Sequence, residues 1–326
     1  MPIRKKTLVI IVFYKKHIKV TSFYNISEFE KETLENLPQM IENNVPIYWD
    51  LMGMDQDNEF LIRAIKEKVL WHPPYPKRDI HIKYEDLEDT LRGQDDQPLY
   101  AEKILKKHNI WDPVKPGFYI EAGAAGGELY SNTLYFEMKY NWTGLLVEPS
   151  PIWWKELKSK NRNAWILPHC LSTEKRVHLI DFYIFSPTFK GMGDDFGFNS
   201  RKEMNESFYQ DIVKNNPGAI NKLKVQCFPI QAVLKAINSP TVTYFSLDIE
   251  GEEYNVLKTM DFSEIDISVL GVEIFPSGPD DALRINSGTK EQIHDYLKEN
   301  SYNFVDSVEI DDFFIKQSFA ANVLDV

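Results

Sequence analysis

The sequence predicts an α/β fold in which a mostly parallel sheet is covered by helices on both faces. Two observations lead to this prediction. From Gly117 onward, short apolar runs of strand type alternate with stretches of helical spacing. The first of these strands also runs directly into a glycine-rich loop. Nucleotide-binding α/β folds hold their ligands at such loops, at the carboxyl ends of the strands.

The glycine loop follows the first predicted strand, Phe118–Ile120, and reads Glu-Ala-Gly-Ala-Ala-Gly-Gly over residues 121–127. Among these small residues only Glu121 carries a charged side chain. Glycines let backbone N–H groups come close to a ligand, so the loop is expected to offer bare N–H groups to whatever binds there. An ordinary glycine-rich turn is the alternative that this segment alone leaves open.

A helix and a second strand come after the loop. The stretch 131–140 has helical spacing, with Leu134 and Met138 four residues apart on one face. The strand Gly144–Val147 then ends at Glu148. In nucleotide-binding α/β folds an acidic residue at this position accepts hydrogen bonds from the ribose hydroxyls, so Glu148 is a candidate ribose ligand. The alternative is an exposed carboxylate that happens to follow a strand.

The same alternation continues to the end of the chain. Ser150 followed by proline is a favourable helix start, and Thr289 with Gln292 forms a capping box that opens the last predicted helix. The chain closes with two short strands spaced like a hairpin with a longer loop. The elements predicted after Glu148 are helix 151–160, strand 164–167, strand 242–247, helix 252–260, strand 267–272, a helix from 290, and strands 303–305 and 312–315.

Three carboxylates stand at the ends of two predicted strands. Asp248 and Glu250 follow strand 242–247, and Glu273 ends strand 267–272. Carboxyl ends of parallel strands share one edge of a sheet, where a general base or a hard cation could be held. We therefore take Asp248 and Glu250 as candidate catalytic residues, and all three as candidate metal ligands. A helix-capping role for Asp248 and a structural role for Glu250 remain open.

Composition limits the classes of partner and of structural site. The formal net charge is −12, from 37 basic and 49 acidic residues. The sequence shows no basic stripe, which argues against a nucleic-acid partner. The two cysteines, Cys170 and Cys227, are too few for a disulfide scaffold and lack zinc-site spacing. A disulfide between them and two buried thiols are both left open.

The chain divides into an N-terminal extension, residues 1–110, and a main domain, residues 111–326, with an insertion at about 172–228. The extension reads as helices, such as 55–71, interrupted by a proline-rich loop. Its apolar segment 7–14 has basic flanks and is shorter than the roughly twenty residues that span a bilayer. The sequence is compatible with two interpretations of this segment: a buried strand, or part of a signal or membrane anchor.

Several long motifs resemble the FkbM-type methyltransferase family. They include the glycine loop with its strand, the run Asn141–Pro149 and the run Tyr244–Glu252. Shorter stretches, Lys160–Trp165 and Cys170–Ser172, add to the resemblance. Within the family the chain is most similar to the animal branch that includes the Star protein. The segments that resemble that branch are Asp55–Asp57, together with the helix that follows, and Val225–Pro229.

The resemblance implies a three-layer, seven-stranded, Rossmann-like sheet of the class I S-adenosylmethionine-dependent type, with the last strand antiparallel. It also implies S-adenosylmethionine as cofactor and leaves a divalent cation open. The methionine half of the cofactor would lie on the glycine loop, the ribose at Glu148, and the adenine just past the third strand. The cofactor residues implied in this way are Glu121, Gly123, Ala124, Gly127, Glu148, His169 and Cys170.

Two functions follow from the resemblance. The first is O-methyl transfer to a hydroxyl of a small molecule or a glycan. The second is a Star-like, non-catalytic role, in which the fold binds a protein cargo and regulates trafficking and EGF-receptor-ligand signalling in the ER, Golgi or endosomes. Both a cytoplasmic and an ER- or Golgi-associated location stay open. An NAD-dependent enzyme is disfavoured because the loop glycines are spaced G-x-x-G-G.

Overall fold

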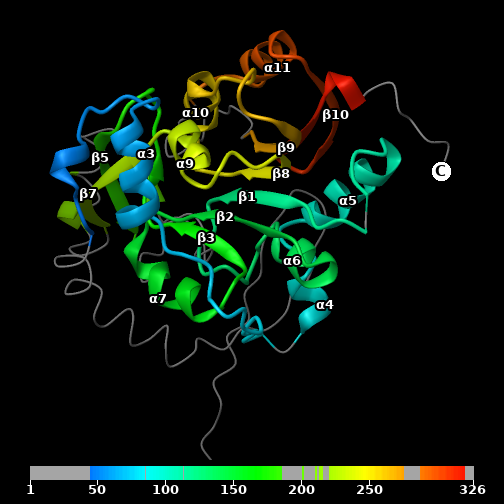
Figure 1. Ribbon diagram of the computed structural model, residues 1–326, viewed down its shortest axis with the longest axis horizontal. Helices are drawn as coiled ribbons and strands as arrows, with labels where there is room; N and C mark the ends of the chain where they lie inside the picture. The colour runs from blue at the N-terminus through cyan, green and yellow to red at the C-terminus, as the bar shows by residue number, and fades with distance from the viewer. Residues whose placement is uncertain are drawn as a thin grey trace, which may run out of the picture.

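A seven-stranded sheet with helices on both faces forms the centre of the molecule (Figure 1). The structure is a computed structural model, and it describes residues 45–84, 86–112, 114–185, 200–201, 210, 213–215, 220–274 and 287–319. The strand order is β10-β11-β9-β8-β1-β2-β3. All neighbouring pairs from β9 to β3 are parallel, whereas β11 is antiparallel to both of its neighbours. The predicted α/β class, with its last strand antiparallel, is confirmed.

The strands of this sheet lie close to their predicted positions. The central strand β8 and its neighbour β9 are buried along their whole length. A parallel strand covered on both faces needs such a continuous apolar run. The strands are β1 (Phe118–Ala122), β2 (Thr143–Val147), β3 (Ala164–Leu167), β8 (Val242–Leu247), β9 (Ile267–Glu273), β10 (Tyr302–Val308) and β11 (Asp311–Lys316).

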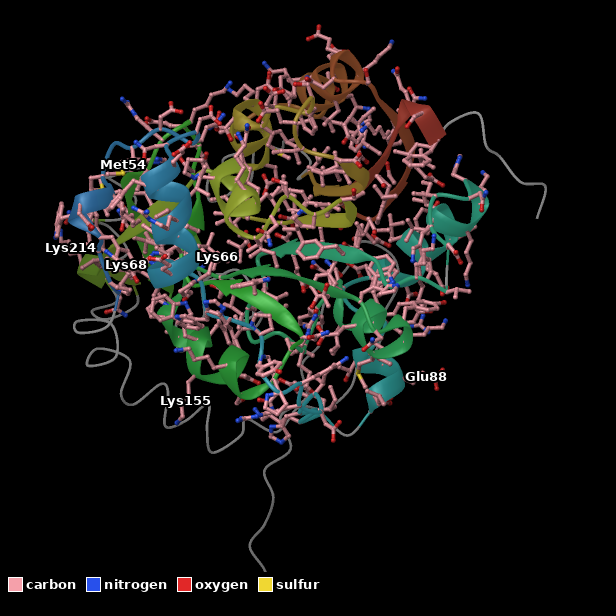
Figure 2. All side chains as sticks on the ribbon, viewed as in Figure 1. Met54, Lys66, Lys68, Glu88, Lys155 and Lys214 are labelled. Carbon is pink, nitrogen blue, oxygen red and sulfur yellow. A yellow bond between two sulfur atoms is a disulfide. The ribbon has the colours of Figure 1, made fainter. Side chains whose placement is uncertain are left out.

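Two groups of helices cover the two faces of the sheet. One face packs against α9 (Ile230–Ala236), α10 (Glu253–Thr259) and α11 (Lys290–Glu299). The other packs against α5 (Gln97–Lys107), α6 (Leu134–Tyr140) and α7 (Pro151–Ser159). Figure 2 shows that side chains fill the space between these layers. Two separate hydrophobic cores therefore hold the sheet between its helices.

Two details of the predicted elements differ from the structure. Helix α6 begins at Leu134 rather than near 131, because the preceding residues form a turn around Glu121. The hairpin β10–β11 has only two connecting residues, 309–310, since both strands are longer than predicted. The capping box at Thr289 is confirmed: its side chain accepts from the N–H of Gln292, whose side chain accepts in return.

A smaller sheet of order β4-β7-β5-β6 occupies the predicted insertion. Its strands are β4 (Cys170–Leu171), β5 (His178–Phe185), β6 (Ser200–Arg201) and β7 (Ile220–Phe228). Strand β4 pairs with β7 in a register that places Cys170 opposite Cys227, and the two residues form a disulfide. The pairing that the sequence left open is therefore present in the structure, and it joins the two ends of the insertion.

The described part of the N-terminal extension packs onto the main sheet. It contains η1 (Trp49–Leu51), α3 (Glu59–Ala64), the π-helical turn η2 (Ile65–Val69) and α4 (Leu87–Thr90). The predicted helix 55–71 starts only at Glu59, because Asn58 caps it by accepting from two backbone N–H groups. Residues of η1, α3 and η2 share one hydrophobic core with the strands. The proposed domain boundary stays a prediction.

The apolar segment 7–14 lies outside the described residues, so its alternatives stay open. Within the described ranges, the helices are too short or too polar to cross a bilayer. Charged side chains such as those of Glu88 and Lys155 lie at the periphery of the molecule (Figure 2).

Candidate cofactor and catalytic site

The carboxyl ends of β1, β2 and β8 meet at one edge of the sheet. Ala122, the last residue of β1, pairs with Val147 of β2 on one side and with Leu247 of β8 on the other. The residues that follow these three strands are therefore neighbours in space. Gly123, Glu148 and Asp248 come from segments far apart in the sequence and share this edge, as expected for parallel strands.

Gly123 is exposed at this edge, and its backbone requires glycine. It adopts φ +93°, in a region that side chains rarely occupy. A Cβ atom there would lie 2.0 Å from the carbonyl oxygen of Asp248, which also excludes any side chain on steric grounds. The backbones that follow β1 and β8 therefore lie in close contact here, and the Gly123 backbone is exposed at the edge of the sheet.

The N–H groups of the glycine loop bond within the protein, which corrects one expectation. The N–H groups of Gly123 and Ala124 both donate to the carbonyl of Val147, at 3.1 Å. The N–H of Gly127 donates to the carbonyl of Ala124 at 2.8 Å. The prediction that the loop offers bare N–H groups to a ligand is therefore wrong for these three residues. The assignment of these three residues to the cofactor stays a prediction.

Glu121 is buried at the end of β1, and its contacts go to the turn before α6. It accepts from the hydroxyl of Ser131 at 2.9 Å, the N–H of Asn132 at 2.7 Å and the hydroxyl of Thr133 at 2.5 Å. Burial raises the pKa of Glu121, and the nearby Arg162 guanidinium opposes that rise. The structure gives Glu121 a positioning role for this turn; its contact with the methionine half of a cofactor stays a prediction.

Arg162 organises the region behind the loop and was not singled out from the sequence. Its fully buried guanidinium donates to the carboxylate of Glu137 at 2.7 Å, the carbonyl of Gly127 at 2.6 Å and the hydroxyl of Thr133 at 3.0 Å. A buried arginine needs such complete pairing. It ties the glycine loop to the turn that Glu121 holds. Its signals in the sequence were a charge just before β3 and its place in the family-like stretch Lys160–Trp165.

Glu148 is buried at the tip of β2, and backbone groups orient its carboxylate. One oxygen accepts from the N–H of Ala125 at 2.7 Å and the other from the N–H of Ser150 at 2.7 Å. Burial raises the pKa of Glu148 to about 7; the two N–H groups lower it, and the charge of Asp248 adds to the rise. A carboxylate has about four acceptor positions, so one remains on each oxygen. Two neighbouring ribose hydroxyls fit this arrangement.

His169 and Cys170, the predicted adenine contacts, are not available for that role. The ring of His169 is fully buried between Tyr48 and Phe228, with ring centroids 5.8 Å and 5.1 Å away. Burial lowers the pKa of His169 to about 3, so the ring is neutral. Cys170 is bonded to Cys227. Both residues belong to the packing of the smaller sheet, which corrects the prediction.

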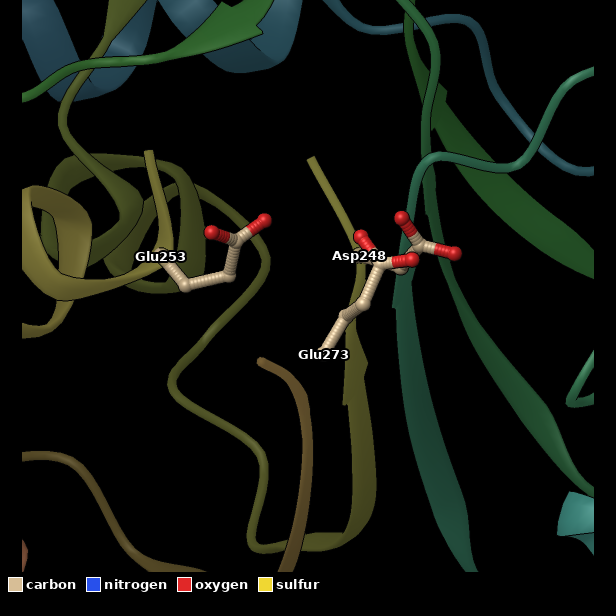
Figure 3. Close-up of side chains that lie close together, drawn as sticks. All are labelled: Asp248, Glu253 and Glu273. Atoms are coloured by element: carbon tan, nitrogen blue, oxygen red, sulfur yellow. The ribbon is translucent and has the colours of Figure 1, made fainter. Parts of the chain in front are cut away.

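Three carboxylates converge beside this edge: Asp248 after β8, Glu273 at the end of β9, and Glu253 at the start of α10 (Figure 3). One ligand oxygen from each lies within 4.8 Å of the others. The predicted metal set is therefore corrected in one member, because Glu253 and not Glu250 joins the cluster. Glu250 sits in the intervening turn with φ +63°, a left-handed conformation that is uncommon for glutamate.

Glu253 shapes the turn that separates it from Asp248. One of its oxygens accepts from the N–H of Ile249 at 2.8 Å and from the N–H of Gly251 at 3.1 Å. Burial raises its pKa to about 7, and the charge of Asp248 adds to the rise. The N-cap residue of α10 is Glu252, so the capping role considered for Asp248 is not observed.

The region that holds this site matches a known family. Residues 121–304, more than half of the chain, match the sequence profile of the methyltransferase FkbM domain. The chain belongs to the FkbM methyltransferase family. The matched region begins at Glu121 and ends within β10, so it contains the glycine loop, Glu148 and the carboxylate cluster. No curated protein sequence matches the chain significantly.

Several of the similar solved structures are methyltransferases of low sequence identity. The magnesium protoporphyrin IX methyltransferase of Synechocystis PCC 6803, with bound SAM, is 10% identical over 72% of this chain and 86% of its own, with a TM-score of 0.32. An O-methyltransferase family protein from Burkholderia thailandensis is 8% identical over 68% and 57%, with a TM-score of 0.32. A SAM-dependent methyltransferase from Aquifex aeolicus is 9% identical over 72% and 97%, with a TM-score of 0.29.

Proposed function

We propose that this FkbM-family protein is an S-adenosylmethionine-dependent O-methyltransferase that acts on a hydroxyl of a small molecule or a glycan. The observation that carries the proposal is the carboxylate of Glu148. It stands at the tip of β2, beside the glycine loop, with one acceptor position left on each oxygen. A vicinal pair of ribose hydroxyls matches those two positions, as in other nucleotide-binding α/β sheets.

The residues around Glu148 fit the rest of this cofactor. Gly123 supplies an exposed backbone at the edge of the sheet, where a side chain would collide with Asp248. Arg162 and Glu121 fix the loop from behind through Gly127 and the 131–133 turn. When bound, S-adenosylmethionine supplies an activated methyl group. The protein's task is then to align the acceptor with that group, which can be worth several kcal/mol.

Asp248 is the residue that we assign to the acceptor's proton. When an acceptor oxygen forms its new bond to the methyl carbon, its proton must leave, and a carboxylate within reach can accept it. Asp248 is half-buried beside Gly123, and its N–H donates to the carbonyl of Ala122 at 3.1 Å. It is therefore held next to the predicted cofactor loop. Glu250, two residues further on, is the second candidate for the same role.

Calorimetric titration of the full chain with S-adenosylmethionine tests the proposal. We expect micromolar binding, with a loss of affinity of about a hundredfold in Glu148→Ala, because two hydrogen bonds to a charged group are removed. Glu291→Ala, an exposed glutamate on α11, is the matched control and should bind normally. A folded wild-type protein that does not bind the cofactor would overturn the proposal.

The same titration separates this function from the Star-like alternative. A non-catalytic module that binds protein cargo has no need for the cofactor, whereas an enzyme must bind it. Asp248→Asn gives the next step: it should retain cofactor affinity within about threefold and lose turnover with an acceptor by at least a hundredfold, the usual size of a general-base effect. Unchanged turnover would reject Asp248 as the base.

We further propose that the chain matures in an oxidising compartment such as the ER or Golgi. The support for this is the disulfide between Cys170 and Cys227, since disulfides are rare in cytosolic proteins. Asn141 of the Asn-Trp-Thr sequon is also exposed. Protein from cells should show a glycosidase-sensitive mobility shift that Asn141→Gln reduces. If Cys170 and Cys227 are free thiols and the protein shows no glycosidase-sensitive mobility shift, the result would indicate a cytoplasmic location.

A further inference from the structure

We infer that Asp248, Glu253 and Glu273 form a binding site for one hard divalent cation, of the class Mg²⁺, Mn²⁺ or Ca²⁺. The three residues come from β8, α10 and β9, and each contributes a ligand oxygen within 4.8 Å of the other two (Figure 3). Three carboxylates brought this close by separate elements repel each other in the absence of a compensating charge. The fold maintains this arrangement, which points to a bound positive charge.

Glu273 gives an independent indication of a ligand. Glu273 is only 2% exposed. In the described part of the chain, its Oε2 atom has no hydrogen-bond partner. A buried carboxylate oxygen without a partner is costly, because it has lost its water and gained nothing in return. A cation in contact with Oε2 would relieve this cost.

Among the described residues, the charged neighbours that act most strongly on the cluster are acidic. In the described ranges, neither Glu253 nor Glu273 takes part in an ion pair with a lysine, arginine or histidine. Asp311 lies opposite Glu273 in the pairing of β11 with β9 and is itself buried. The side-chain amide of Gln97 donates to it at 2.5 Å. Compensation from these described neighbours is therefore absent at two of the three carboxylates.

The chemistry of the ligands selects the class of cation. All three donors are carboxylate oxygens, which suit Mg²⁺, Mn²⁺ and Ca²⁺. Zn²⁺ and copper sites usually include nitrogen or sulfur ligands, and none belongs to this cluster. The cation site itself does not depend on the proposed function. Where both hold, a hard cation next to the cofactor loop favours an oxygen acceptor over a nitrogen or sulfur one, which deepens the proposed function.

Metal binding by the full chain, without cofactor or acceptor, tests the inference. The metal-free protein is titrated with Mn²⁺ and followed by electron paramagnetic resonance, and Mg²⁺ and Ca²⁺ are then added as competitors. We expect one Mn²⁺ per chain, displaced by at least one competitor. Glu273→Gln and Glu253→Gln should each weaken Mn²⁺ binding at least tenfold. Glu291→Gln, an exposed glutamate on the same face of the sheet, is the matched control and should bind like wild type.

A second measurement guards against variants that fail to fold. Mn²⁺ should raise the melting temperature of the wild type and of Glu291→Gln, but not that of folded Glu273→Gln, because binding to the native state stabilises it. No binding by folded wild type at millimolar Mn²⁺, or undiminished binding by both cluster variants, would overturn the site. Cofactor binding without metal binding would reject only the cation site. Metal binding without cofactor binding would reject only the proposed function.

Discussion

Two groups of buried carboxylates lie near the same edge of the sheet, and they differ in how their charge is balanced. Behind the glycine loop, Glu121 and Glu137 face the Arg162 guanidinium and several donors. Glu253 at the start of α10 and Glu273 at the end of β9 have acidic neighbours and, among the described residues, no basic one. Within the described part of the chain, the first group is therefore neutralised internally and the second is not.

The difference separates structural from functional carboxylates. A buried charge that the protein itself satisfies contributes to the positioning of the backbone, because removing one partner leaves the other unpaired. A buried charge that the protein does not satisfy costs stability, and folds retain such groups mainly where a ligand or a reaction uses them. On this basis Glu121 and Arg162 shape the loop. Oε2 of Glu273, in contrast, has no hydrogen-bond partner among the described residues, and Glu253 has two backbone N–H donors but no basic partner there. The predictions that follow test this distinction.

The largest expected effect is at Arg162. Arg162→Met keeps much of the side-chain volume and removes the charge that Glu121 and Glu137 share. It should lower the free energy of unfolding by about 3–5 kcal/mol, the usual cost of breaking a buried ion pair. Urea denaturation followed by circular dichroism measures this loss. Arg63→Met, at an exposed arginine of α3, is the control and should change stability by less than about 0.5 kcal/mol.

Glu121→Gln should have the next largest effect. The amide would replace a carboxylate that accepts from Ser131, Asn132 and Thr133 and that faces Arg162. We expect a loss of about 2 kcal/mol in the free energy of unfolding, because hydrogen bonds to a charged group are among the strongest in proteins. A variant as stable as wild type would mean that this carboxylate is not structurally compensated.

The parts of this picture that could be predicted from the sequence depend on local patterns. The glycine loop, the strand that ends at Glu148 and the run Tyr244–Asp248 lie within short segments, so their residue types reveal the strand ends. The fold followed because apolar runs of buried parallel strands are distinctive. These features predicted which residues would share the edge of the sheet, although not how their side chains bond.

The remaining parts depend on contacts that no local pattern contains. Glu253 joins the cluster only because the turn after Asp248 folds back on itself through a left-handed Glu250. Arg162 reaches Gly127 across 35 positions, and Cys170 meets Cys227 across 57. The predicted role of Cys170 at the adenine failed for the same reason, since the smaller sheet that buries it is formed by distant segments.

Glu148 stands between the two groups, because its donors among the described residues are backbone N–H groups. The affinity of the protein for the cofactor should therefore depend on pH. Burial raises the pKa of Glu148 to about 7, with the charge of Asp248 adding to the effect. Only the ionised form accepts from both ribose hydroxyls, so binding should release a proton below pH 7. Calorimetric affinity for S-adenosylmethionine should therefore rise by about tenfold from pH 6 to pH 8 and then level off. Glu148→Gln should abolish this dependence; an equally steep rise in that variant would assign it to another group.

The smallest effect is expected for Glu273→Gln. It is also the sharpest test of the distinction, because Glu121→Gln makes the same glutamate-to-glutamine change in the other group. Glu273→Gln removes a buried carboxylate that Asp248 and Glu253 repel and that has no basic partner among the described residues. In buffer free of divalent cations we expect the free energy of unfolding to stay the same or to rise by up to about 1 kcal/mol, since replacing an uncompensated charge relieves repulsion. Glu121→Gln under identical conditions should move in the opposite direction. If Glu273→Gln costs as much as Glu121→Gln, the cluster at β8 and β9 is compensated within the protein, and the distinction between the two groups is wrong.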